Sequence, residues 1–95
     1  MKVIYHGHSC VQLVHEQHAI LIDPFLTGNP AAVTDPADIQ ADVVLLTHAH
    51  PDHIGDAESI ARSNDAVVVG SFELATYYGW KGLRTRAMNI GGTID

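Results

Sequence analysis

The first quarter of the chain alternates between apolar and polar positions with a period of two, which is typical of half-buried β-strands. Within residues 9–15, for example, Val11 and Leu13 fall on the same side of an extended chain. Residues 16–17 suit a tight turn, and Pro24 would end the last strand because proline cannot donate a ladder hydrogen bond. We predict an antiparallel meander with strands at residues 2–6, 9–15 and 18–23.

Beyond residue 41 the pattern changes to short, continuous apolar runs that alternate with segments of helical period. The runs at 42–47 and 66–69 predict strands that are buried on both faces. Apolar positions at three- and four-residue spacing predict a helix over 54–63. A strand–helix–strand order implies parallel pairing through a right-handed crossover.

The remaining segments carry weaker patterns. Residues 24–41 have no clean period and are predicted to form a long loop with a short helix around 36–39. Ser71 can cap a second helix over 72–78, which we expect Gly79 to end. The tail is predicted to hold a strand that starts at residue 83 and ends at Gly91-Gly92, followed by the start of another strand at 93–95.

Composition narrows the class of protein. The 95 residues are 46% apolar and 17% charged, which indicates one globular domain or part of one. The formal net charge is −6 and no basic stripe is present, so we do not expect nucleic acid as a partner. The apolar runs are too short for a bilayer and no secretory signal is visible, so we expect no membrane partner and a cytoplasmic protein. We interpret the single cysteine, Cys10, as a buried structural residue.

The side chains best suited to bind a metal or to act in catalysis are concentrated in one heptapeptide, Thr-His-Ala-His-Pro-Asp-His at residues 47–53. It lies between a predicted strand and a predicted helix, and ligands of open α/β sheets gather at the carboxyl ends of strands. If the backbone stays extended, His48, His50 and Asp52 project to one side, and the following turn can bring His53 beside Asp52. Packing has no need of four such groups. Histidine with carboxylate suits Zn²⁺ and related first-row metals, so we predict a metal site.

The heptapeptide resembles the T-H-x-H-x-D-H motif of the metallo-β-lactamase superfamily. Residues 19–24 look like that superfamily's strand ending in a buried aspartate. Gly7-His8-Ser9 is similar to the start of a branch that includes lactonase-like proteins and the UPF0173 metal-dependent hydrolases. The resemblance covers the whole chain. It implies an α/β (α+β) fold, an αββα sandwich of two mixed sheets flanked by helices.

The same resemblance implies a two-metal hydrolase. His48 and His50 would bind one ion, and Asp52 and His53 would bind the other. We expect two Zn²⁺, although Mn, Fe or Ni also suits these ligands. The metals would activate a water for attack on an ester, lactone or phosphoester bond of a small-molecule substrate. Asp52 would be the catalytic residue that orients the nucleophile or relays a proton.

The residues around the motif allow more than one interpretation of their roles. The resemblance implies that Asp23 and Thr47 hold the histidine-bearing loop without binding metal. Asp23 suits equally well a strand end that caps the turn at Pro24. We interpret His6 and His8 as ordinary histidines on one face of the first strand, while the resemblance leaves open an approach of His8 to the site.

The chain lacks the later ligands of the family's site. No histidine follows His53, and we expect Asp56 in the first turn of a helix, where its charge favours the helix dipole. We therefore expect residues 1–95 to be the N-terminal part of a single, truncated domain, roughly the first half of the sandwich. Two alternatives stay open: a metal-binding redox or sensing protein without hydrolytic activity, and a structural half-domain that works only with its C-terminal half or as a homo-oligomer.

Overall fold

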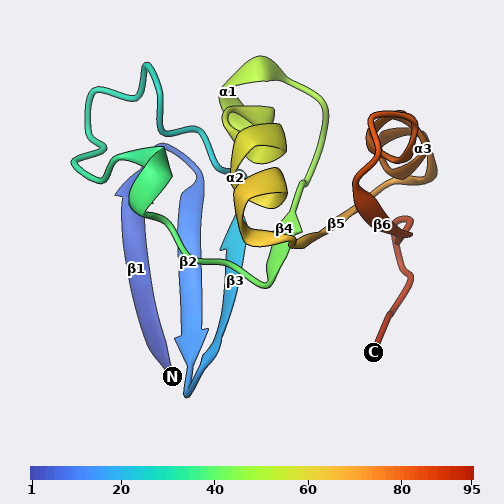
Figure 1. The fold of residues 1–95 in the computed structure, drawn as a ribbon, viewed down its shortest axis with the longest axis horizontal. Helices are drawn as coiled ribbons and strands as arrows, with labels where there is room; N and C mark the ends of the chain where they lie inside the picture. The colour runs from blue at the N-terminus through green and yellow to red at the C-terminus, as the bar shows by residue number, and fades with distance from the viewer.

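Six strands form one mixed sheet in the sequential order β1-β2-β3-β4-β5-β6, and the computed structural model describes residues 1–95 (Figure 1). Strands β1 to β3 pair antiparallel, and β3 to β6 pair parallel. Both the predicted meander and the predicted parallel pairing are therefore confirmed. The strands are β1 (Lys2–Gly7), β2 (Cys10–His15), β3 (His18–Ile22), β4 (Val43–Leu45), β5 (Val67–Gly70) and β6 (Arg84–Ala87).

Helical segments connect the parallel strands and correct two predicted boundaries. The helix expected over 54–63 is interrupted at Gly55 and Asp56, which separate two helices, because the backbone there turns to meet the segment after β3. The helix expected over 72–78 does not end at Gly79, because the positive φ that the turn requires falls at Gly82. The helices are α1 (Pro51–Ile54), α2 (Ala57–Asn64) and α3 (Phe72–Trp80), and a short 3₁₀ turn, η1, spans Pro36–Asp38 within the long loop.

Two further predictions about strands are corrected. The strand expected over 42–47 is regular only over β4, although the Leu46 amide still donates to Val69 O at 2.8 Å. No strand forms at 93–95, because these residues pair with no neighbouring strand after the turn at Gly91. β6 is therefore the last strand of the sheet (Figure 1).

The core lies between the sheet and the helices. Leu21, Val44 and Val68 are paired across β3, β4 and β5 in register and are fully buried. Ile60 of α2 belongs to the same cluster, and the contacts of α2 with β4 and β5 place this helix over that face (Figure 1). The alternate residues of these strands point to the opposite face, where they line an open apolar hollow of about 670 Å³. The helices are too short and too polar to cross a membrane.

Candidate metal centre

The heptapeptide leaves the sheet at the carboxyl end of β4 and turns into α1. His50 keeps an extended backbone and Pro51 takes the first helical position, where its missing N–H costs nothing. Asp52 and His53 are therefore helical. The extended arrangement predicted for Asp52 is wrong, because α1 begins one residue before it. The helix still turns both side chains toward the end of the sheet where His48 lies, with the His48 and His53 ring centroids 4.0 Å apart.

Asp23 lies at the centre of the site with its side chain almost fully buried. Its Oδ1 accepts a hydrogen bond from the Thr47 amide at 2.8 Å, and its Oδ2 accepts one from the Thr47 hydroxyl at 2.7 Å. The same Oδ2 lies 2.9 Å from His53 Nδ1. A carboxylate can only accept, so His53 Nδ1 carries the proton and His53 Nε2 keeps its lone pair for a ligand.

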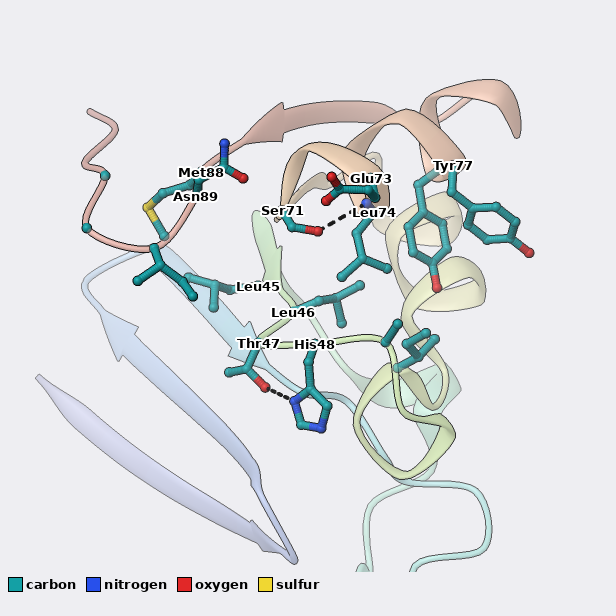
Figure 2. A pocket seen from close by; sticks show the side chains of 16 residues that line it. Leu45, Leu46, Thr47, His48, Ser71, Glu73, Leu74, Tyr77, Met88 and Asn89 are labelled. Atoms are coloured by element: carbon teal, nitrogen blue, oxygen red, sulfur yellow. Dashed lines mark hydrogen bonds between the residues drawn. The ribbon is translucent and has the colours of Figure 1, made fainter.

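Thr47 transmits the same constraint to His48. A hydroxyl has one proton, and that of Thr47 is donated to Asp23. At the 2.9 Å contact between Thr47 Oγ1 and His48 Nδ1, the hydroxyl therefore accepts and the imidazole donates (Figure 2). His48 Nε2 is thereby the unprotonated nitrogen of the ring. One buried carboxylate thus fixes the tautomers of both His48 and His53.

His48 and His50 form the first pair of candidate ligands. His50 Nδ1 donates a hydrogen bond to His48 Nε2 at 3.1 Å, and a bound ion would take the place of that proton. Two nitrogens bound at about 2.0–2.1 Å to one tetrahedral ion lie roughly 3.3 Å apart, so this pair has nearly the separation that a shared Zn²⁺ requires.

Asp52 and His53 form the second pair, and His8 joins them. His8 Nε2 is 3.2 Å from Asp52 Oδ2, and His53 Nε2 is 3.9 Å from Asp52 Oδ1. One ligand atom from each of the three side chains lies within 4.8 Å of the others. The interpretation of His8 as a strand histidine is wrong, because β1 ends at Gly7 and His8 occupies the turn before β2 with φ of 55°.

His6 behaves differently from His8. Its buried side chain shares a hydrogen bond of 3.0 Å between Nε2 and Gln12 Oε1, and Gln12 Nε2 donates to Gln40 O. This chain of contacts ties the long loop to β1 and β2. His6 therefore has a structural partner, Gln12, and both side chains are buried where the long loop meets the meander.

Asp56 and Gly55 have a role that the sequence did not indicate. Asp56 is the residue before α2, and its carboxylate accepts hydrogen bonds from the Leu26 and Thr27 amides and the Thr27 hydroxyl. Asp56 thus stands directly before the first turn of α2 rather than within it, and its carboxylate also clamps the segment after β3. A side chain at Gly55 would collide with Phe25, since an added Cβ would lie 2.5 Å from Phe25 Cα.

Cys10 takes no part in this chemistry. The thiol is fully buried, and burial together with the nearby carboxylate of Asp23 raises the pKa of Cys10 to about 11. It stays protonated and inaccessible at neutral pH, which confirms the structural interpretation.

A hollow of about 1190 Å³ opens beside His48 (Figure 2). Its walls come from the end of β4, from α3 and from the segment after β6, and they are mostly apolar. Leu46, Tyr77 and Asn89 represent the three walls. One of the candidate ligands, His48, therefore borders a space in which a small organic molecule could lie.

The donor set fits divalent metal. It consists of imidazole nitrogens and a carboxylate, with no thiolate, and two of its imidazoles are held in the tautomer that exposes Nε2. The half-exposed carboxylate of Asp52 leaves the cluster open on one side, as a site that admits substrate requires.

Comparisons with known proteins show the family to which the chain belongs. The family model of the metallo-beta-lactamase superfamily matches residues 5–94. The chain is 55% identical over 95 residues to a UPF0173 metal-dependent hydrolase of Geobacillus thermodenitrificans, covering 100% of this chain and 42% of the relative. It is 54% identical over 93 residues to the UPF0173 metal-dependent hydrolase YtkL of Bacillus subtilis, covering 98% of this chain and 41% of the relative.

A solved structure has the same fold. Igni18, a metallo hydrolase from the archaeon Ignicoccus hospitalis, superimposes with a TM-score of 0.88 at 35% identity, covering 98% of this chain and 41% of Igni18. The chain thus spans about two fifths of the length of the relatives it matches and corresponds to the N-terminal part of the fold. The fold class expected from the sequence is confirmed.

Proposed function

Since this chain belongs to the metallo-β-lactamase superfamily, we propose that the full-length protein is a metal-dependent hydrolase acting on an ester, lactone or phosphoester-type small molecule. The supporting observation is the convergence of histidine and carboxylate ligands around one buried carboxylate, Asp23, that fixes their tautomers. The names of the relatives, which are metal-dependent hydrolases, support the same reaction class.

The residues divide into two ligand pairs. His48 and His50 would hold one ion, and Asp52 and His53 would hold the other. A divalent metal, when bound, lowers the pKa of water enough to supply hydroxide near neutral pH. We propose Zn²⁺, because imidazole and carboxylate ligands suit it, with Mn, Fe or Ni as alternatives that the ligand set also permits.

The chain's own residues then position the reaction. Asp52 is half-exposed and can accept a proton from the attacking water or orient it toward the substrate. Asp23 and Thr47 hold the imidazoles of His48 and His53 in place, so that little reorganisation accompanies the reaction. The apolar hollow beside His48 can receive the organic part of a small substrate. We also propose a cytoplasmic location, since the single cysteine is free and buried.

Turnover by metal-depleted and reloaded full-length protein tests the proposal. A panel of esters, lactones and phosphodiesters is assayed after chelation and after addition of Zn²⁺, Mn²⁺, Fe²⁺ or Ni²⁺. At least one class should be hydrolysed only by the reloaded protein. His48→Ala and Asp52→Ala should each lower kcat/KM by about 1000-fold or more, the equivalent of the several kcal/mol that a metal contributes. The matched control is His18→Ala, whose side chain is 79% exposed and lies at the opposite end of β3.

The outcomes separate the candidate functions. Metal binding without turnover of any class would favour the redox or sensing alternative. Turnover that survives chelation and both substitutions would contradict the proposal outright.

A further inference from the structure

His8 sits in a turn whose backbone is fixed from several directions. The Tyr5 hydroxyl donates to His8 O at 2.7 Å. The preceding Gly7 has φ of 104° and lies so close to the long loop that an added Cβ would be 2.6 Å from Ala31 Cβ. The turn thus depends on a glycine at one position and on a residue that tolerates the left-handed region at the next.

The His8 ring is also held at its flanks. It meets the Phe25 ring edge-on with centroids 5.5 Å apart, and the His53 ring edge-on at 5.2 Å. Phe25 is in turn part of the segment that Asp56 and Gly55 fix against α2. These contacts direct His8 Nε2 to Asp52 Oδ2, at 3.2 Å, although 43 residues separate the two positions along the chain.

The number of ligands that a metal ion needs can explain why His8 lies beside Asp52. The heptapeptide offers two pairs of ligands, whereas a catalytic Zn²⁺ is usually held by three protein ligands, so each ion has room for a further ligand from this chain or from the rest of the full-length protein. Near Asp52 and His53, His8 is the third side chain whose ligand atom comes within 4.8 Å of the others. We propose that His8 Nε2 is a direct ligand of the ion held by Asp52 and His53, which rests on the metal centre of the proposed function.

An ordinary ion pair accounts less well for the arrangement. The His8 and Asp52 side chains are 38% and 49% exposed, and exposed pairs contribute little to stability. Such a pair gives no reason for a left-handed turn held by a tyrosine, a phenylalanine and a close-packed glycine. A ligand position does, because metal ligands must be held in place before the ion binds.

Nuclear magnetic resonance of the full-length protein with isotope-labelled histidine tests the ligation directly. On addition of Cd²⁺ as the probe ion, the Nε2 resonances of His8 and His53 should shift and show scalar coupling to cadmium. His18, which is exposed at the far end of the sheet, is the internal control and should show neither effect. Cadmium coupling at His53 with an uncoupled, protonated Nε2 at His8 would overturn the proposal, because His8 would then only donate to Asp52.

Variants provide a second measurement. His8→Asn keeps a residue that tolerates positive φ and removes the imidazole. It should weaken binding of one of the two ions by about 100-fold or more and leave the other unchanged. Tyr5→Phe removes only the hydrogen bond to His8 O. It should weaken binding of the same ion by about 10-fold, which is the lower end of the effect expected for a group that orients a ligand. Equal affinity of both ions for His8→Asn and wild type overturns this inference alone, whereas a wild type that binds no metal overturns the proposed function.

Discussion

Replacing Asp23 with asparagine changes one acceptor oxygen to an NH₂ group and leaves the shape of the side chain unchanged. Asparagine also tolerates the positive φ of 47° that this position requires. The remaining oxygen is needed by the Thr47 amide, so the NH₂ group faces the Thr47 hydroxyl and His53 Nδ1. Both of these must then accept a hydrogen bond. The protons of His53 and, through Thr47, of His48 move to Nε2, where they block metal ligation.

The expected magnitudes follow from the bonds that change. All three hydrogen bonds to the charged carboxylate, at about 1.5–3 kcal/mol each, become neutral bonds at about 0.5–1.5 kcal/mol. The free energy of unfolding of the metal-free protein should fall by about 3–4 kcal/mol. Each ion should bind about 10- to 100-fold more weakly, because a group that orients a ligand typically contributes that much.

Chelator competition and chemical denaturation of the full-length protein measure the two effects. The matched control is Asp42→Asn, in which an exposed carboxylate at the other end of the sheet accepts a bond from the Ala19 amide. It should leave both metal affinities unchanged. If Asp23→Asn destabilises the protein but binds both ions as tightly as wild type, Asp23 supports only the fold, and the tautomer reasoning is wrong.

Three further predictions concern the scaffold. Gly55→Ala should lower the free energy of unfolding by about 3 kcal/mol or more in chemical denaturation, because φ is 46° and the new Cβ would lie 2.5 Å from Phe25 Cα; wild-type stability would refute the close approach. Burial raises the pKa of Cys10 from 9.0 to about 11, so the folded thiol keeps a proton that the unfolded thiol releases. The free energy of unfolding should therefore fall as pH rises from 9 to 11, by up to about 2–3 kcal/mol, and Cys10→Ala should lose that component of the slope. Ser71→Ala removes the cap on the Leu74 amide and should cost about 1 kcal/mol in the same assay without changing metal affinity.

Local patterns were sufficient for most of the sheet. Alternation in β2 and the apolar runs of β4 and β5 place residues on faces that the observed register confirms. The clustering of ligands at 48–53 was visible because all four lie within six residues, so that local geometry alone brings them together.

Long-range contacts account for what the sequence did not predict. His8 looked like a strand residue because alternation continues through it, and only the turn that follows Gly7 brings it to Asp52. The break at Gly55 arises from contact with Phe25, which lies 30 residues earlier in the chain. Asp56 was assigned to a helix dipole because its partners are amides of a loop without a clear period. Tertiary packing decides each of these positions.

We propose that the heptapeptide and Asp23 build a two-ion centre at the end of the sheet. Anomalous diffraction from crystals of the zinc-loaded full-length protein measures it most directly. We expect two peaks at coordination distance, about 2.0–2.2 Å, one from His48 and His50 and one from Asp52 and His53. Peaks found only elsewhere in the molecule, or none at these four side chains, would contradict it.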